Sequence, residues 1–153
     1  MEVTYRGSMY NSYSNEYSGS VEIPATVYVY GTTYNVTSIG SYAFYGCDSL
    51  KNIDIHSVTT VDTNAFYSEE NTTLDSLSVS ADAKFGSNIV KHCANLNVYL
   101  TNLTSWFNTS KSLFLYVRKL TTNTHLYFNN ELLTEFNVPD SITEITKLRG
   151  GVF

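Results

Sequence analysis

Apolar residues recur along residues 36–55 at spacings that predict a tight turn followed by a short strand. The segment ends in Leu50-x-x-Ile53-x-Ile55, where apolar and polar residues alternate. Side chains of a strand point alternately to its two faces, so Ile53 and Ile55 share one face. We therefore predict a strand that turns this face to a core. The apolar positions of the segment are Val36, Ile39, Ala43, Phe44, Cys47, Leu50, Ile53 and Ile55.

The first half of this pattern recurs 22 residues later. Val58-x-x-Val61 repeats Val36-x-x-Ile39 (58 − 36 = 22), and Ala65-Phe66 repeats Ala43-Phe44 at the same spacing. A period of about 20–29 residues is typical of leucine-rich repeats, in which each unit presents one short strand. A single unit cannot bury its apolar face alone, so at least three must stack. We expect Phe44 and Phe66 to stack in one shared core.

The second half of the pattern recurs with a two-residue insertion. Leu74-x-x-Leu77-x-Val79 follows Leu50-x-x-Ile53-x-Ile55 by 24 residues (74 − 50 = 24). We expect residues 53–55 and 77–79 to pair as parallel neighbours in a sheet. A third, degenerate copy begins at Cys93-x-x-Leu96 and ends at Leu100. Single helical turns are expected near residues 41–46 and 63–68.

The chain on either side of these copies predicts hairpins and one helix. Val27–Tyr30 and Thr33–Val36 alternate around Gly31-Thr32, and Gly first in a two-residue loop fits a type II′ turn. This hairpin would cover the open edge where the repeats begin. Thr101 or Asn102 is a suitable cap for a short helix within residues 101–110. Asn129-Asn130 fits a second hairpin turn, because Asn tolerates positive φ.

With these residues in view, the chain resembles the BspA-like leucine-rich repeat proteins. The matching stretches are residues 20–55 and 126–145, and the run Ile-Gly-x-x-Ala-Phe-x-x-Cys-x-x-Leu at Ile39–Leu50 is the most specific part. The resemblance implies an extracellular or surface-attached protein that takes part in adhesion and binds other proteins. The second copy departs from the family pattern, since Asp62 replaces the glycine and Asn71 the cysteine.

The fold that we predict is a mostly β, short leucine-rich-repeat solenoid with parallel strands, in a single domain of residues 1–153. Residues 1–36 would form a β-hairpin cap, and residues 36–100 about three repeats. Residues 101–135 would form an insertion with a helix and a hairpin, and residues 136–153 the start of an incomplete repeat. An open repeat edge at that end favours self-association.

Composition and charge narrow the function classes. Nine Lys and Arg against fourteen Asp and Glu give a net charge of −5. No basic stripe is present to neutralise phosphates, so we exclude nucleic acid as a partner. No apolar run approaches the roughly 20 residues that span a bilayer. The N-terminal MEVTYRG is not a signal peptide, which leaves a cytosolic protein or a mature secreted form open from sequence alone.

The residues with reactive side chains predict no catalytic, cofactor or metal site. Cys47 and Cys93 take equivalent places two windings apart, about 10 Å, which exceeds the Cα separation of about 7 Å that a disulfide allows. We expect two buried free thiols. His56, His92 and His125 share no metal-ligand spacing. A hydrolase whose carboxylates meet only in the fold is kept as the least favoured alternative, because such pairs are set by space.

The outward positions of the predicted sheet form the candidate binding face. If the apolar residues of the strands point inward, the residues between them point outward and run from polar to aromatic. Tyr and Phe are enriched where binding energy concentrates, which favours a module that binds protein. The alternative ligand is a carbohydrate that the exposed Tyr and Phe would bind. The predicted face consists of Asp54, Ser78, Tyr99, Phe114, Tyr116 and Asn137.

Overall fold

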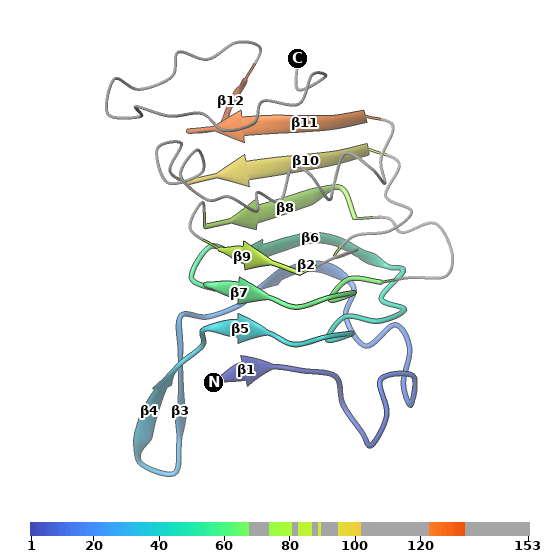
Figure 1. Cartoon of the computed structure of the whole chain (residues 1–153), viewed down its shortest axis with the longest axis vertical. Helices are drawn as coiled ribbons and strands as arrows, with labels where there is room; N and C mark the ends of the chain where they lie inside the picture. The colour runs from blue at the N-terminus through green and yellow to red at the C-terminus, as the bar shows by residue number, and fades with distance from the viewer. Residues whose placement is uncertain (68–73, 81–82, 87–88, 90–94, 102–122, 134–153) are drawn as a thin grey trace.

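The computed structural model describes residues 1–67, 74–80, 83–86, 89, 95–101 and 123–133. These residues contain twelve strands and no helix, and the strands form three sheets. The windings of the chain stack on one another from β1 to β11 (Figure 1). The structure is therefore mostly β, as the apolar pattern predicts.

The larger sheet has six strands in the order β12-β11-β10-β8-β6-β2, and all neighbours are parallel except β11 and β12. The smaller sheet has four parallel strands in the order β1-β5-β7-β9. The larger sheet consists of β2 (Gly19–Glu22), β6 (Leu50–Ile55), β8 (Ser76–Val79), β10 (Asn95–Leu100), β11 (Asn123–Phe128) and β12 (Glu131–Leu132). The smaller sheet consists of β1 (Glu2–Val3), β5 (Ser38–Ile39), β7 (Thr60–Val61) and β9 (Lys84–Phe85).

Successive windings lie in register. Ile53 pairs with Leu77 and Ile55 with Val79 in the larger sheet, and Val61 pairs with Phe85 in the smaller one. The predicted parallel pairing of residues 53–55 with 77–79 is confirmed. In the described residues, four windings each supply one strand to each sheet, and the apolar side chains meet between the two sheets. The four strand pairs are β1 with β2, β5 with β6, β7 with β8, and β9 with β10.

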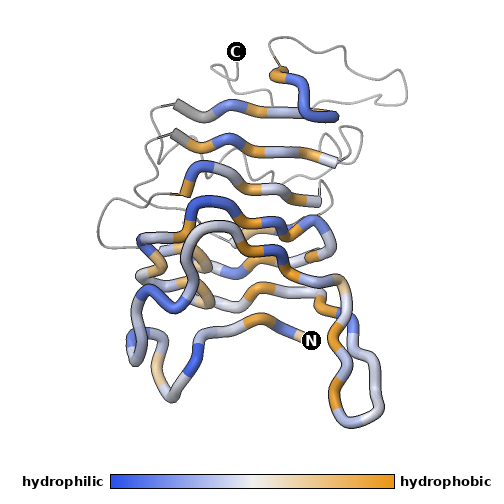
Figure 2. Tube along the Cα trace, turned by 180° about the vertical axis from the view of Figure 1, so that it is seen from behind, coloured by the Kyte–Doolittle hydropathy of each residue, from blue (hydrophilic) through white to orange (hydrophobic). Residues whose placement is uncertain are grey.

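The core between the sheets is continuous from one winding to the next. Ile39, Ile53 and Leu77 are among its fully buried side chains. The rings of Phe44 and Phe66 stack with centroids 5.1 Å apart and an angle of 17° between their planes, as predicted. Hydrophobic and hydrophilic residues alternate along the strands of the larger sheet (Figure 2), because only every second side chain enters the core.

The Ala-Phe segments form hydrogen-bonded turns at the predicted places, but these turns are not helical. Tyr42 and Asn64 have φ values of 60° and 58°, which a right-handed helix does not allow. The turns are instead held to the next winding. The amide of Phe44 donates to the carbonyl of Ala65 at 2.9 Å, and that of Phe66 to the carbonyl of Ile89 at 2.9 Å.

The N-terminal segment is itself a winding, which the sequence reading did not anticipate. β1 pairs with β5, and β2 pairs with β6, both in parallel. The predicted hairpin exists as β3 (Thr26–Val29) and β4 (Thr32–Asn35), but these strands form a separate two-stranded sheet that projects from the molecule (Figure 1). Its role as a cover for the first edge is therefore wrong.

The turn of this hairpin also differs from the prediction. Val29 pairs with Thr32, so the loop residues are Tyr30 and Gly31 rather than Gly31 and Thr32. Their φ values of 46° and 84° are both positive, which fits a type I′ turn and not type II′. The error of one residue arose because the glycine takes the second place of the loop.

Asn129 and Asn130 connect β11 and β12 with φ values of 51° and 64°, so the predicted second hairpin is confirmed. Its first strand joins the parallel sheet directly, beside β10.

Three predictions lie outside the described residues. They are the helix within 101–110, which falls on residues 102–122, and the incomplete repeat of residues 136–153 with its open edge, which falls on residues 134–153. The described residues contain no helix that could support the helical insertion.

Candidate functional site

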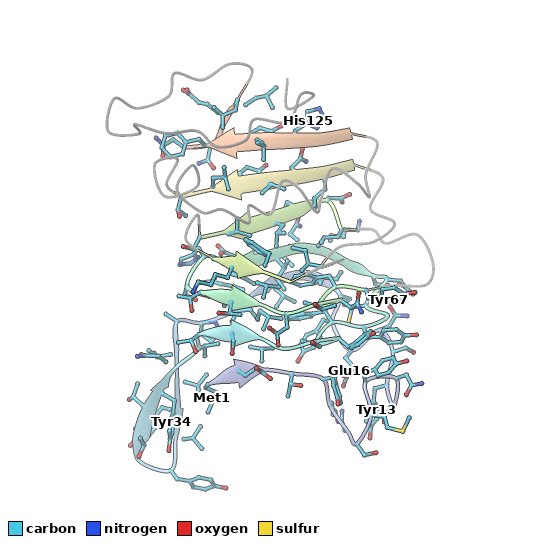
Figure 3. The ribbon with its side chains drawn as sticks, in the orientation of Figure 1. Met1, Tyr13, Glu16, Tyr34, Tyr67 and His125 are labelled. Carbon is cyan, nitrogen blue, oxygen red and sulfur yellow. The ribbon has the colours of Figure 1, made fainter. Side chains whose placement is uncertain are left out.

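The outer face of the larger sheet carries a row of polar side chains that crosses its strands. The register aligns one residue from each of β2, β6, β8, β10 and β11. The amide of Asn52 donates to Ser20 Oγ at 2.9 Å, and Ser76 Oγ donates to Asn52 Oδ1 at 2.8 Å. These bonds hold the side chains close to the sheet. The row consists of Ser20, Asn52, Ser76, Asn97 and His125, the last labelled on β11 in Figure 3.

A second row, two residues further along each strand, runs from acidic to aromatic. Glu22 lies beside Asp54, and Tyr99 lies beside Tyr127, with Ser78 between the two pairs. The rings of Tyr99 and Tyr127 stack with centroids 4.8 Å apart and planes 18° from parallel. Since cross-strand aromatic pairs stabilise a sheet, this contact also fixes both rings.

Three of the predicted face residues, Asp54, Ser78 and Tyr99, lie together in this row. Phe114, Tyr116 and Asn137 lie outside the described residues. The neighbour of Tyr99 on the next strand is Tyr127, which the sequence reading missed. The signal was present, because Asn-Val-Tyr-Leu at 97–100 and His-Leu-Tyr-Phe at 125–128 share one order of polar, apolar, Tyr and apolar residues.

An open pocket of about 340 Å³ lies where the second row meets the carboxyl ends of the strands. Asn129 and Asn130, in the turn between β11 and β12, line it together with the tyrosine pair. Ligand pockets commonly have volumes of about 300–1,000 Å³, so this pocket suits a single side chain or a single sugar. Its lining residues are Asp54, His56, Ser78, Tyr99, Leu100, Thr101, Tyr127, Asn129 and Asn130.

Asp54 and His56 form a fixed pair at the rim of this pocket. His56 Nδ1 lies 2.6 Å from Asp54 Oδ1, and the backbone amide of His56 donates to the same oxygen at 3.0 Å. The side chains are 38% and 49% exposed, and exposed pairs add little to stability. The pair therefore matters more for the orientation of the carboxylate than for the fold.

The carboxylates at the pocket bear on the hydrolase alternative. Asp54 is the one carboxylate among the described residues that line it, so it holds no convergent pair of acids of the kind that a glycoside hydrolase uses. Within the described part of the chain, no three His, Cys, Asp or Glu side chains lie close enough to hold a metal ion. The sequence-derived alternative of a hydrolase finds no support in this pocket.

Cys47 lies in the core, and its Sγ lies 3.9 Å from the carbonyl of Tyr45, as a weak donor. Burial raises the pKa of its thiol above the ordinary value, although backbone hydrogen bonds from Tyr17 and Glu16 act in the opposite direction. A thiol kept protonated is a poor nucleophile. Cys47 is free, as predicted, and Cys93 lies outside the described residues.

A cluster of tyrosines lies at the turns between the sheets. Tyr10 stacks on Tyr42 with centroids 4.4 Å apart, and Tyr45 stacks on Tyr67 with centroids 5.9 Å apart. In Figure 3, Tyr67 lies on the opposite side of the molecule from Tyr34, which belongs to the projecting hairpin. These rings contact one another across successive windings, so the cluster supports the stack.

Comparison with protein families matches residues 11–148 to the BspA type leucine-rich repeat region, in 6 copies. No curated protein and no solved structure matches the chain. A search of the described residues for a helix long and apolar enough to cross a membrane finds none.

Proposed function

Because this chain belongs to the BspA-type leucine-rich repeat family, we propose that it is a non-catalytic module that binds other proteins through the outer face of the larger sheet. The family is in general a scaffold for protein interaction or adhesion. Its members are commonly surface or secreted proteins of bacteria. A location at the cell surface or outside the cell is part of the proposal for this chain.

The observation that carries the proposal is the pair of aligned rows on that face. The stacked tyrosine pair resembles the cores of protein interfaces, which are enriched in Tyr. The fixed polar side chains beside it resemble the polar rims of such interfaces. Repeat proteins commonly bind through such extended surfaces. The proposed face begins with Asp54, Ser78 and Tyr99 and continues on the next strand with Tyr127. Phe114, Tyr116 and Asn137, which the sequence also predicts on this face, lie outside the described residues.

Affinity capture with a matched pair of variants tests the proposal. Tyr99→Ser combined with Tyr127→Ser removes the aromatic end of the face. Tyr28→Ser combined with Tyr30→Ser removes two tyrosines of the hairpin that are 74% and 102% exposed. We expect the wild-type chain and the hairpin variant to retain the same bacterial or host surface proteins, and the face variant to lose them.

Two results would contradict the proposal. One is the recovery of no specific protein from surface extracts by the wild-type chain. The other is a partner that the face variant retains and the hairpin variant loses. Thermal melts of both variants exclude misfolding as the cause of a loss.

Carbohydrate is the second candidate ligand, and the pocket beside Tyr99 favours it. A stacked aromatic pair next to a carboxylate and two asparagines offers both a ring and hydrogen-bonding groups to a sugar. The sequence-based alternative thus stays a proposal. Glycan-array binding that is lost in Tyr99→Ala would support it, and an array without signal would remove it.

A further inference from the structure

We propose that the pocket above Ser78 receives the guanidinium group of an arginine side chain from the partner protein. This inference rests on the proposed function, because the partner supplies the arginine. It adds the chemistry that the partner must present at one defined point of the face.

The second row forms a slot with two walls and a floor. Asp54, Ser78 and Tyr99 occupy aligned positions on β6, β8 and β10, three successive strands of the sheet. Neighbouring strands lie about 4.8 Å apart, so the backbones that carry Asp54 and Tyr99 are separated by about 10 Å. The short side chain of Ser78 leaves the space between the two larger ones open. This space is one end of the pocket, which extends past Tyr99 to Tyr127 and to the turn at Asn129 and Asn130.

The wall at Tyr99 is an aromatic face. The rings of Tyr99 and Tyr127 are nearly parallel, and their 4.8 Å separation equals the spacing of the strands. The ring planes therefore stand across the row, and the face of Tyr99 that is not covered by Tyr127 is turned toward the space above Ser78. A cation within about 6 Å of a tyrosine ring centroid is attracted by the ring, and arginine is the cation found most often in that place.

The wall at Asp54 is a carboxylate with a fixed orientation. Both contacts from His56 fall on Oδ1, so Oδ2 is the oxygen that an incoming N–H group would meet. Glu22 lies next to Asp54 in the row and adds negative charge behind it. The described residues that line the pocket include no Lys or Arg, and the chain carries a net charge of −5. Charge complementarity thus favours a cationic occupant over a neutral sugar.

Arginine fits both walls better than lysine does. Its guanidinium is planar, so it can stack on the ring of Tyr99 while its edge donates hydrogen bonds to Asp54. The ammonium of lysine is a compact charge that cannot stack in this way. A slot with a ring on one side and a carboxylate on the other is therefore selective between the two cations.

Titration of the full chain with blocked tripeptides, followed by amide NMR shifts, tests the inference. The peptides are Gly-Arg-Gly, Gly-Lys-Gly and Gly-citrulline-Gly, where citrulline keeps the shape of arginine without its charge. We expect Gly-Arg-Gly to shift the amides of Asp54, Ser78 and Tyr99, and citrulline to bind at least about tenfold more weakly. Gly-Lys-Gly should bind with an affinity between those of the arginine and citrulline peptides. Methyl glycosides serve as the neutral sugar probes.

Three variants locate the binding. Asp54→Asn removes one charge from the slot and should weaken Gly-Arg-Gly by about tenfold or more. Glu22→Gln removes one charge from the same row outside the pocket. It should weaken the binding of Gly-Arg-Gly less than about threefold. Ser78→Tyr fills the slot without a change in charge and should abolish binding. Dispersed amide spectra establish that each variant is folded.

The inference is overturned if citrulline binds as well as arginine, if a methyl glycoside shifts these amides and arginine does not, or if no peptide shifts them. Equal losses in Asp54→Asn and Glu22→Gln would also overturn it, because they would indicate attraction to a diffuse negative surface. Its failure is distinct from that of the proposed function. A captured partner without arginine binding contradicts the slot alone, and arginine binding without a captured partner contradicts the proposed function alone.

Discussion

At the scale of single residues, the repeat preserves backbone conformation where it does not preserve the residue. Tyr42 and Asn64 hold the same place in successive windings, and both lie in the left-handed region. Asn adopts that conformation readily, whereas Tyr does so at a cost in free energy. The amide of Asn64 donates to the hydroxyl of Tyr42 at 2.8 Å, so a contact between windings offsets part of this cost.

Gly86 is the glycine that the stack most clearly requires. An added Cβ there would clash with the backbone nitrogen of Thr63 and lie 2.8 Å from the carbonyl carbon of Asp62, in the winding before it. We predict that Gly86→Ala lowers the free energy of unfolding by about 1–3 kcal/mol, measured in urea melts. Gly40→Ala is the control, because the three atoms nearest to its added Cβ all belong to the flexible Glu2 side chain. Equal losses in the two variants would contradict the close approach.

Cys47 yields a prediction about pH and reactivity. Burial raises its thiol pKa in the folded chain, so folding disfavours the thiolate. The contribution of the buried, protonated thiol to the free energy of unfolding is fully present below the ordinary thiol pKa of about 8.5. It is lost as pH rises through the raised pKa of the folded chain. In a Cys93→Ala background at pH 8.5, we expect iodoacetamide to modify the folded chain at least about tenfold more slowly than the urea-unfolded chain. Equal rates would show that the thiol is accessible.

At the scale of elements, the strands with regular apolar spacing could be predicted, and those that follow an interruption could not. β6 and β8 follow the same Leu-x-x-apolar-x-apolar order, and their pairing was predictable. The winding of β1 and β2 was missed because the hairpin interrupts the period. Val21 and Ile53 are aligned but lie 32 residues apart (53 − 21), which equals one period of 22 plus the ten residues of Thr26–Asn35.

β9 was missed for a different reason. Its residue Phe85 and the Gly86 that follows it come 46 residues after Ile39 and Gly40 (85 − 39), the same spacing that relates Cys93 to Cys47. This copy lacks the Ala-Phe pair, so the repeat pattern was too weak to recognise without the strand register.

The pocket could be predicted only in part. Asn129 reaches it from the turn after β11, and sequence spacing did not place β11 beside β10.

The projecting hairpin yields a prediction about turn chemistry. Tyr30 holds a positive φ of 46° with its side chain fully exposed, and Asn-Gly is the preferred pair for a type I′ turn. We expect Tyr30→Asn to raise the free energy of unfolding by up to about 1 kcal/mol. Tyr28→Asn places the same substitution on β3, where it should destabilise, because Asn is a poor strand residue. Thermal melts that order the two variants the other way would contradict the assigned turn.

At the scale of the whole molecule, the two sheets and the core between them form one continuous stack. The larger sheet is parallel from β2 to β11, and the smaller one from β1 to β9. Each winding contacts mainly its neighbours, so stability depends on the interfaces between windings. The same alignment positions the two rows on the outer face, which means that the proposed binding surface exists only while the windings stay in register.

A double-mutant cycle on Phe44 and Phe66 measures this stacking most directly. Phe→Leu at each position removes a ring while it keeps most of the volume, so the chain should stay folded. Because the rings stack at 5.1 Å across two windings, we predict a coupling free energy of about 0.5–1.5 kcal/mol between the substitutions in urea melts. Losses that add within about 0.3 kcal/mol would mean that the two rings do not share one core, and would contradict the stacked windings.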